Sequence, residues 1–276
     1  MNRTAKPGAL LTYGAMVVGA LITLFPYYQL AVMASNTTAD IYSSPPTFWF
    51  GGHLFENIGE VFAKIDFFGS VLNTLVVAIA TTLLVLFFDS LAAFTFAKYD
   101  FPGSNVLFAI LLATFVVPTQ LAAIPQFDLM AKFGLVGSLN ALIIPAAANA
   151  FGIFWMRQYA RSAISDEILE AARVDGAGFF RTYLSVGLPV LRPALAFLGI
   201  FTFVNAWNDY LWPLVVLIDS NHTTLQVALS QLNGLYLQDY AVVMAGTLVA
   251  IVPLVIVFLF GARHFIRNIA AGAVKG

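Results

Sequence analysis

The chain has 276 residues, of which 60% are hydrophobic and 10% are charged, and its formal net charge is −1. A soluble domain carries about 25% charged residues, so this composition indicates an integral membrane protein. The charge balance provides no basic field for nucleic acid. The sequence contains no cysteine, which excludes disulfides, thiolate nucleophiles and zinc–thiolate sites. We therefore expect a membrane protein with no metal site and no nucleic-acid partner.

Six apolar segments approach the length of about 20 residues that a helix needs to cross a bilayer. Their apolar runs are continuous rather than alternating, which favours an all-α protein over a barrel. The first run lacks a small-residue cleavage site, so we interpret it as a retained signal-anchor helix. The predicted spans are Ala9–Met33, Phe68–Phe96, Asn105–Gln120, Gly137–Trp155, Pro193–Ile218 and Tyr240–Ala262.

Positive charge is distributed unequally between the two sides of these spans. With the N-terminus in the cytoplasm, eleven of the thirteen Lys and Arg residues lie on the inner side, and only Lys64 and Lys132 lie outside. Because cytoplasmic loops carry the excess of Lys and Arg, we predict that both termini and the segment 158–192 are cytoplasmic. The outer loop carries Trp49, which is interpreted as an interfacial anchor, with contact to an external partner as the alternative.

The cytoplasmic segment 158–192 is long for so apolar a protein. Ser165 is a good N-cap, and Asp166 and Glu167 follow it in the first turn, where the helix dipole favours anions. The predicted helix ends at Asp175-Gly176, because glycine tolerates the left-handed cap conformation. This segment is therefore expected to be ordered rather than a simple connection.

A second helix is predicted over 179–186, and Pro189 and Pro193 close the segment before the fifth span. The first helix carries acids beside two arginines, whereas an amphipathic hairpin lying on lipid would favour a polar face rich in Lys and Arg. Docking to another protein is therefore the favoured interpretation, and binding to the lipid surface is the alternative.

The residues Glu170-Ala171-Ala172, Gly176 and Leu188-Pro189 resemble the EAA loop of ABC-importer permeases. That pattern is Glu-Ala-Ala, three residues, Gly, nine residues and Ile-x-Leu-Pro, and here Val186 replaces the Ile. The segment 205–214 is similar to the fifth span of the second permease in carbohydrate importers of the maltose-transporter type. The tail 270–276 is similar to the C-terminus of that class, so the resemblance covers nearly the whole chain.

The resemblance implies one permease domain over 1–276, with a coupling loop at 158–192 and a cytoplasmic tail at 263–276. It implies a bacterial or archaeal cell membrane and a cargo such as an oligosaccharide or glycerol-phosphate, moved by alternating access. The implied partners are a sister permease with six or more spans, two ATPase subunits that bind ATP and Mg, and an extracytoplasmic solute-binding protein. The residues implied for ATPase coupling are Glu170, Ala171, Ala172, Asp175, Gly176, Phe179, Leu188, Pro189 and Lys275.

Polar residues inside the spans point to a path for the cargo, since a charged side chain in a bilayer commonly faces a cavity or a partner. A stripe at helical spacing in the fifth span combines amides with an aromatic ring, which suits a sugar. Polar contacts between helices are the alternative. Asp89 is interpreted as structural, pairing with Lys98 or reaching water at the inner leaflet. The predicted path residues are Asn205, Asn208, Asp209, Trp212, Gln120 and Asn149.

Two other classes of function fit the sequence less well. An intramembrane aspartyl protease needs two carboxylates at one depth, whereas Asp89 and Asp209 fall toward opposite faces and lack a Gly-x-Gly-Asp context. An ion-coupled secondary carrier commonly shows inverted repeats, and the sequence shows none. A phosphate-cradling Gly-rich motif is also absent, so we expect no enzymatic activity here and ATP hydrolysis by a partner.

Overall fold

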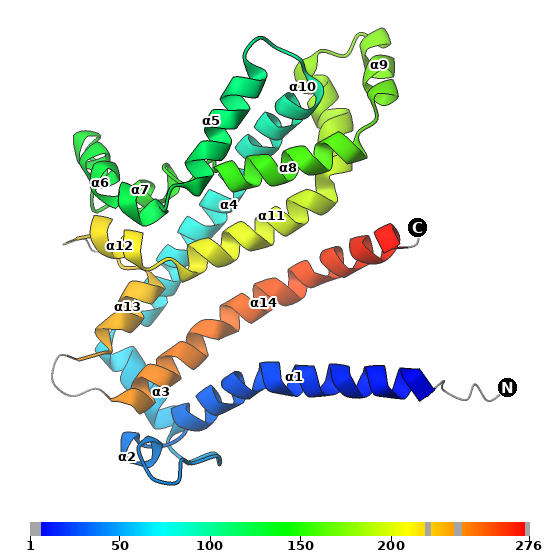
Figure 1. The fold of residues 1–276 in the computed structure, drawn as a ribbon. Coiled ribbons are helices and arrows are strands. Elements are labelled where there is room, and N and C mark those ends of the chain that lie inside the picture. Colours follow the sequence, from blue (N-terminus) through cyan, green and yellow to red (C-terminus); the bar gives the residue numbers. More distant parts are fainter. Residues whose placement is uncertain (1–6, 219–221, 235–238, 274–276) are drawn as a thin grey trace. The chain divides into compact units, whose positions relative to one another are not determined.

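The computed structural model describes residues 7–218, 222–234 and 239–273, and this part of the chain contains helices and no strands. It confirms the prediction of an all-α protein. The contacts divide the chain into two compact units, Met1–Phe67 with Ala228–Val252, and Phe68–Val227 with Pro253–Gly276. Figure 1 shows the helices in sequence colours.

Four helices within the described residues are long and apolar enough to cross a membrane. They are Leu11–Ala34, Phe67–Lys98, Phe179–Asn208 and Tyr240–Leu259, and they overlap the first, second, fifth and sixth predicted spans. Two further segments, Ser104–Val116 and Thr119–Lys132, qualify together as a pair bent by 95°. The chain is therefore a multi-pass membrane protein.

The first unit contains α1 (Pro7–Ala34), α2 (Thr38–Ile41), α3 (Leu54–Lys64) and the first part of α14 (Tyr240–Ala273). The buried Asn57 side chain donates to the carbonyl oxygens of Ala34 and Asn36, at 2.9 and 3.0 Å, and so satisfies acceptors at the end of α1. Trp49 is 80% exposed in the loop between α2 and α3. Its anchoring role stays a prediction.

The second unit begins with α4 (Phe67–Lys98), the longest helix in this unit, and α5 (Ser104–Val116). The sequence predicts a third span that continues to Gln120, but α5 ends earlier. Val117 is extended at φ −75° and ψ 122°, because the residue before a proline is pushed out of the helical region, here by Pro118. The chain then turns into η1 (Thr119–Ala122) and α6 (Ala123–Lys132).

The fourth predicted span, Gly137–Trp155, is wrong as one continuous helix. The structure has a short α7 (Asn140–Ile143), an irregular connection, and then α8 (Ala150–Ala163). Pro145 removes a backbone donor and disfavours helix in the connection. Asn149 starts α8 from an extended conformation, and its side chain accepts a hydrogen bond from the backbone N–H of Gly152 at 2.8 Å.

The cytoplasmic loop holds α9 (Asp166–Val174), followed by α10 (Phe179–Thr182), η2 (Tyr183–Gly187) and α11 (Leu188–Asn208). The last three form one uninterrupted helical stretch, so the prediction that Pro189 and Pro193 close the segment is wrong. Pro189 lies in the first turn of α11, and it follows a π-helical turn, which is a common way to accommodate an irregular ladder. After α11 come α12 (Leu211–Val216) and α13 (Leu225–Gln231).

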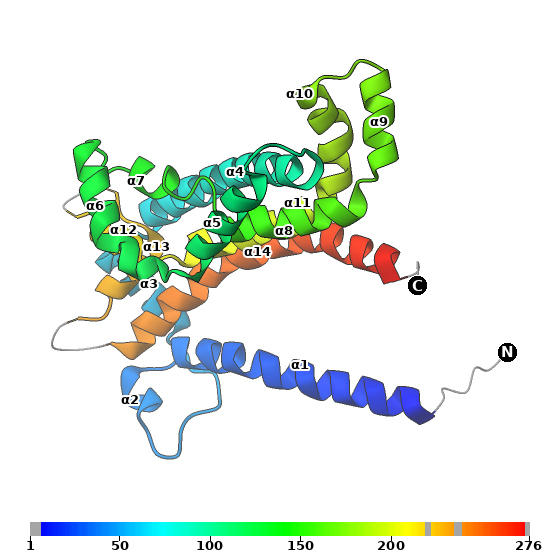
Figure 2. The ribbon, with the colours of Figure 1, turned by 45° about the horizontal axis from the view of Figure 1, so that its top comes forward.

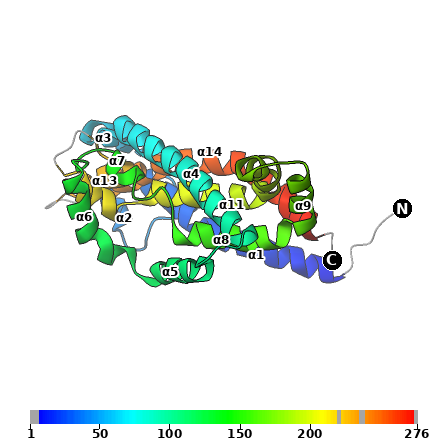
Figure 3. The same cartoon turned by 90° about the horizontal axis from the view of Figure 1, so that it is seen from above.

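Within the second unit, α8 packs against both α5 and α11. The buried core of this packing includes Phe94 of α4, Met156 of α8, and Tyr183 and Leu198 from the η2–α11 stretch. Figures 2 and 3 show α9 at one end of this unit and α6 at the other. The loop helix and the bent segment are therefore connected through the same helical core.

Candidate functional site

Helix α9 begins at Ser165, as the sequence predicts, with extended backbone angles of φ −78° and ψ 149°. The Ser165 side chain makes no capping hydrogen bond to the backbone. Hydrogen bonds to Glu167 from its own backbone N–H and from the Ser165 side chain hold the pKa of this carboxyl below its usual value. The first turn is therefore fixed by a carboxylate at the positive end of the helix.

The end of α9 also matches the prediction. Gly176 has a φ of +72°, a left-handed conformation that glycine adopts without a Cβ penalty. The N–H of Ala177 donates to the Ala172 carbonyl at 2.9 Å, and the N–H of Gly176 donates to the Arg173 carbonyl at 3.0 Å. This pair of bonds is a Schellman cap, so the turn after α9 is well defined.

The surface of α9 is divided between a buried contact and an exposed face. Leu169 is 4% exposed and belongs to the core cluster of the second unit. Glu170, Ala171, Asp175 and Gly176 are exposed, which leaves a small-residue surface with two carboxylates open to a partner.

Polar contacts join the cytoplasmic segment to the end of α4. The Lys98 ammonium lies 2.9 Å from the Asp166 carboxylate at the start of α9. The Arg157 side chain donates to the Phe96 carbonyl at 3.1 Å, and the Arg173 guanidinium lies 5.7 Å from the centre of the Tyr99 ring. The end of α4 therefore contacts both α8, which precedes the loop, and α9 within it.

Beneath these contacts lies a cluster of aromatic rings, Phe94, Tyr99, Phe179 and Tyr183, with centroids 5.1 to 6.0 Å apart. The hydroxyls of Tyr183 and Ser90 lie 2.7 Å apart in a buried hydrogen bond. The rings pack η2 and the start of α10 against α4, and the hydrogen bond between Tyr183 and Ser90 adds to this contact.

Asp89 lies beside Ser90 on α4, and its side chain is fully buried. Its carboxylate accepts hydrogen bonds from the backbone N–H and the side-chain amide of Asn149, both at 3.1 Å. The prediction that Asp89 pairs with Lys98 or water is wrong, because Lys98 pairs with Asp166 and Asn149 satisfies the carboxylate. Asp89 instead holds the start of α8 against α4.

A cavity of about 690 Å³ lies in the second unit, toward the end opposite α9. Its wall comes from α4, from the bent segment η1–α6, from the connection between α7 and α8, and from the region where α11 gives way to α12. The lining residues are Thr81, Val85, Thr119, Gln120, Ala123, Gln126, Leu142, Pro145, Ala146, Ala148, Asn149, Phe201, Thr202, Asn205, Ala206, Asp209, Leu211 and Trp212.

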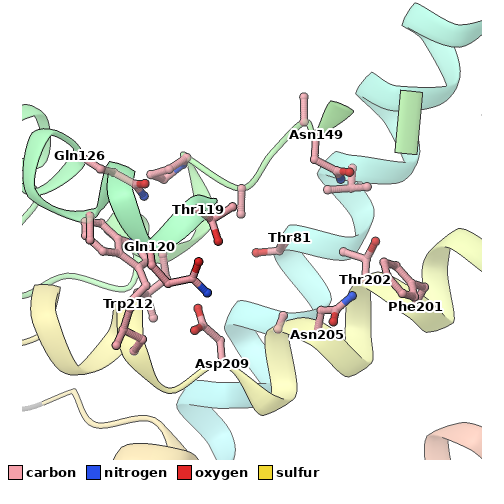
Figure 4. Close-up of a pocket in the computed structure, with 18 residues that line it drawn as sticks. Thr81, Thr119, Gln120, Gln126, Asn149, Phe201, Thr202, Asn205, Asp209 and Trp212 are labelled. Atoms are coloured by element: carbon pink, nitrogen blue, oxygen red, sulfur yellow. The ribbon is translucent and has the colours of Figure 1, made fainter. Parts of the chain in front are cut away.

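Several polar side chains point into this pocket. Figure 4 shows Thr81, Thr119, Gln120 and Asp209 directing polar atoms toward the same space. The Thr81 hydroxyl is buried and has no hydrogen-bond partner among the described residues. A buried hydroxyl without a partner is costly, and Thr81 is one of the residues that line the pocket.

Known protein families and structures match this chain. Residues 89–270 match the family described as "Binding-protein-dependent transport system inner membrane component". The chain is 33% identical over 281 residues to the arabinooligosaccharides transport system permease protein AraQ of Halalkalibacterium halodurans, and the alignment covers 100% of both chains. The chain belongs to this family of inner-membrane permeases.

Two more relatives agree with this assignment. The permease is 33% identical to the lactose transport system permease protein LacG of Rhizobium radiobacter, over 96% of each chain. It also resembles a chain in the crystal structure of a bacterial ABC transporter that imports the acidic polysaccharide alginate, with a TM-score of 0.77, 26% identity, and coverage of 96% and 99%. It is thus an ABC-importer permease subunit, with ATP hydrolysis supplied by a partner, and the secondary-carrier alternative is not favoured.

The permease brings together most, but not all, of the predicted path residues. Asn205, Asp209, Trp212, Gln120 and Asn149 all line the pocket. The residues of the predicted fifth-span stripe do not lie on one helix, because α11 ends at Asn208 and Asp209 has extended angles of φ −68° and ψ 126°. Whether they contact a substrate stays a prediction.

Asn208 is the predicted path residue that does not line the pocket. Its amide donates to the Val204 carbonyl at 2.9 Å, one turn back on α11. Trp212 uses its ring N–H within the protein, donating to the Ala141 carbonyl at 3.0 Å. The ring N–H of Trp212 is therefore already bonded, and Trp212 presents its ring to the pocket.

Four pocket residues were not predicted from the sequence: Thr81, Thr119, Thr202 and Phe201. Threonine in an apolar span carries no signal of its own, since its hydroxyl commonly bonds back to its own helix. Among the coupling residues, Phe179, Leu188 and Pro189 are half-buried. Lys275 lies outside the described residues, so its predicted contact is not addressed by the structure.

Proposed function

We propose that this permease moves a carbohydrate into the cytoplasm by alternating access. It would do so together with a sister permease, two ATPase subunits that bind ATP and Mg, and an extracytoplasmic solute-binding protein. The observation that carries the carbohydrate assignment is the pocket of about 690 Å³ within the span region. Ligand pockets of about 300–1,000 Å³ hold small organic molecules, so the pocket has the size for a sugar.

The chemistry of the pocket wall supports the same cargo. The amides of Gln120 and Asn205 can both donate and accept hydrogen bonds, as sugar hydroxyls can. The rings of Trp212 and Phe201 add flat apolar surface, against which the apolar face of a sugar ring can stack. AraQ and LacG are permeases for arabinooligosaccharides and lactose by name, which favours a sugar for this chain as well.

Six membrane crossings with cytoplasmic termini are the topology that we propose. The four long apolar helices and the bent pair α5–α6 supply five crossings, and α7 with α8 would supply the sixth as a broken span. Broken helices in transporters are tolerated where they border a cavity, and both broken segments line the pocket. The excess of Lys and Arg on the predicted inner side supports the orientation.

Helix α9 is the proposed contact with the ATPase. Its exposed Glu170 and the small residues beside it would enter a groove of that subunit, where the carboxylate could make a charge-assisted hydrogen bond. The ion pair between Lys98 and Asp166 and the aromatic cluster then connect α9 to α4. Since α4 also lines the pocket through Thr81 and Val85, one helix would transmit closure of the ATPases to the cavity.

Uptake by the whole importer tests the transport proposal. The importer is reconstituted into vesicles with its sister permease, ATPases and binding protein, and accumulation of labelled lactose and arabinooligosaccharides is followed. We expect accumulation that requires ATP and persists when ionophores collapse all ion gradients. Accumulation driven by an ion gradient without ATP would contradict the proposal.

The coupling contact can be tested with two isosteric changes on the same helix, Glu170→Gln and Glu167→Gln. Both carboxylates are exposed, but only Glu170 belongs to the proposed contact. We expect Glu170→Gln to lower substrate-stimulated ATPase activity and retention of the ATPase about tenfold, the loss of one charge-assisted hydrogen bond of about 1.4 kcal/mol. Equal effects of the two changes would refute a specific contact at Glu170.

The path can be tested with two asparagines on α11. Asn205 lines the pocket, whereas Asn208 bonds back to its own helix. We expect Asn205→Ala to raise the substrate concentration needed for half-maximal uptake several-fold, and Asn208→Ala to leave it nearly unchanged. A larger effect at Asn208 would place the path elsewhere.

A further inference from the structure

We propose that Asp209 makes the pocket reject anionic solutes, so that the transported carbohydrate is uncharged rather than a sugar acid or a sugar phosphate. This inference rests on the proposed function and narrows it. The distinction matters because the chain is similar both to permeases named for neutral sugars and to a transporter of an acidic polysaccharide. Overall similarity therefore leaves the charge of the cargo open.

The charge of the pocket is the first observation. Of the eighteen described residues that line it, Asp209 is the only charged one, and none is Lys, Arg or His. Protein sites for carboxylates and phosphates are commonly built from Arg and Lys side chains or from free N–H groups at a helix start. The first of these two means is missing from the described pocket wall.

The N–H groups at the helix starts beside the pocket are already used by the protein's own acceptors. At the start of α8, the Asn149 side chain accepts from the Gly152 N–H. The Asp89 carboxylate accepts the N–H of Asn149. At the α11–α12 junction, the Asp209 carboxylate lies close enough to the backbone N–H groups of Tyr210 and Trp212 to interact electrostatically with them. An incoming anion would find these N–H groups already facing the protein's own acceptors, which are the Asn149 amide oxygen and the carboxylates of Asp89 and Asp209.

The Asp209 carboxylate itself faces the cavity. Figure 4 shows it pointing toward Gln120 and the space below Thr119. No ion pair involving Asp209 occurs among the described residues, so only backbone N–H groups oppose the negative charge that this side chain presents in a low-dielectric wall. Like charges repel strongly there, whereas the neutral amide and hydroxyl groups around it can bind sugar hydroxyls.

The absence of cysteine from this chain allows a direct test. Ala206→Cys places one thiol in the pocket, one turn before Asp209. The complex, purified with its sister permease and ATPases, is treated with two methanethiosulfonate reagents of similar size, one carrying trimethylammonium and the other sulfonate. Modification of this chain is followed by mass spectrometry, and the rates are divided by those on free 2-mercaptoethanol.

We expect the normalised rate of the cationic reagent to exceed that of the anionic one by about tenfold, as a charge at this range implies. Asp209→Asn in the same background should bring the ratio toward one, and 1 M salt should reduce it by screening. A ratio near one with Asp209 present, or a ratio that Asp209→Asn leaves unchanged, would overturn the inference. Thr119→Cys on η1 provides a second thiol should the first variant fail to assemble.

Uptake separates this inference from the function on which it rests. Vesicles that hold the full importer are offered lactose, arabinooligosaccharides, alginate oligosaccharides and sn-glycerol-3-phosphate, each with ATP. Uptake of the neutral sugars alone supports the inference, and uptake of either anion overturns it. If no carbohydrate is taken up, the proposed function fails, while the thiol ratio still reports whether the pocket rejects anions.

Discussion

Helix α4 carries buried polar groups in two regions, and these groups are unpaired in one region and hydrogen-bonded in the other. The hydroxyls of Thr81, which lines the pocket, and of Thr82, which does not, are buried and have no partner among the described residues. Two to three turns further along, Asp89 and Ser90 are fully buried, and each is bonded to another helix, through Asn149 and Tyr183. One region leaves buried polar atoms unpaired, and the other uses them to hold the structure together.

The difference teaches which part of α4 serves the cargo and which part transmits motion. A satisfied, close-packed region moves as one body, because its contacts have few alternative arrangements. A region whose buried hydroxyls lack partners gains no such contacts from them, and it is the region of α4 that lines the cavity through Thr81 and Val85. About 25 Å of helix separates Thr81 from Lys98 at 1.5 Å per residue, so α4 can act as a stiff connection between the pocket and α9.

The largest effect on this comparison is expected at Gly152, in the first turn of α8. A Cβ built there would lie 1.9 Å from the Asp89 carboxylate and 3.2 Å from the Leu198 side chain. Gly152→Ala should therefore push α8 away from α4 and destabilise the permease by about 3 kcal/mol, at the upper end for overpacking. The measurement is the thermal unfolding of the purified complex.

A matched control for Gly152 exists on α11. A Cβ at Gly199 would meet its nearest atom, on Leu86, at 3.4 Å, which is ordinary contact. Gly199→Ala should be neutral or slightly stabilising, because alanine is the better helix former. If both changes have the same effect, the close fit between α8 and Asp89 is not what holds this region.

A somewhat smaller effect is expected when the Asp89 carboxylate is removed. Asp89→Ala would leave two part-buried donors of Asn149 without acceptors, which should cost about 2 kcal/mol of stability. Asn149→Ala and the double variant complete a thermodynamic cycle on thermal unfolding, with an expected coupling of about 1 kcal/mol. Additive effects would show that the two side chains do not hold α4 and α8 together.

The features that could be predicted from the sequence are those whose signals lie within a few neighbouring residues. Helix α9 begins at Ser165 and turns at Gly176 as predicted, since a cap and a left-handed glycine act within a few residues. The long apolar helices were predicted for the same reason. The continuous helix across Pro189 was not, because a π-helical turn before a proline has no sequence signature that we could use.

The pairing of Asp89 with Asn149 joins residues 60 positions apart, so the apolar run around each residue gave no sign of it. Asn149 was predicted only as a path residue, yet it also starts α8 and so divides the expected fourth span. The pocket shows the same limit. Its amides and Asp209 stood out as polar residues in apolar spans, whereas Thr81 and Thr202 became visible only when the helices were assembled.

A moderate effect is expected from the hydrogen bond between Ser90 and Tyr183. Tyr183→Phe keeps the ring in its aromatic cluster and removes only the hydroxyl, which should cost about 1 kcal/mol of stability. Because this bond lies between α4 and η2, the same change should also weaken the coupling of ATPase activity to transport. The readout is the number of ATP molecules hydrolysed per sugar transported, and a ratio equal to that of the unmodified importer would remove this bond from the proposed connection.

An effect no larger than that of Tyr183→Phe is expected at the ion pair between Lys98 and Asp166, and it should be asymmetric. The Lys98 side chain is 7% exposed, whereas Asp166 is 78% exposed, so the two partners differ in what their removal leaves behind. Asp166→Asn leaves a nearly buried ammonium without its carboxylate and should cost about 1 kcal/mol. Lys98→Met keeps an apolar stem of similar length and leaves only a hydrated carboxylate, so it should be close to neutral.

Thermal unfolding of the purified complex at low and high salt measures both, and the cost of Asp166→Asn should shrink only slightly with salt because the ammonium is shielded from solvent. If Lys98→Met is the more damaging change, α9 is held to α4 by the charge itself, and the aromatic cluster beneath it carries less of the contact than we infer.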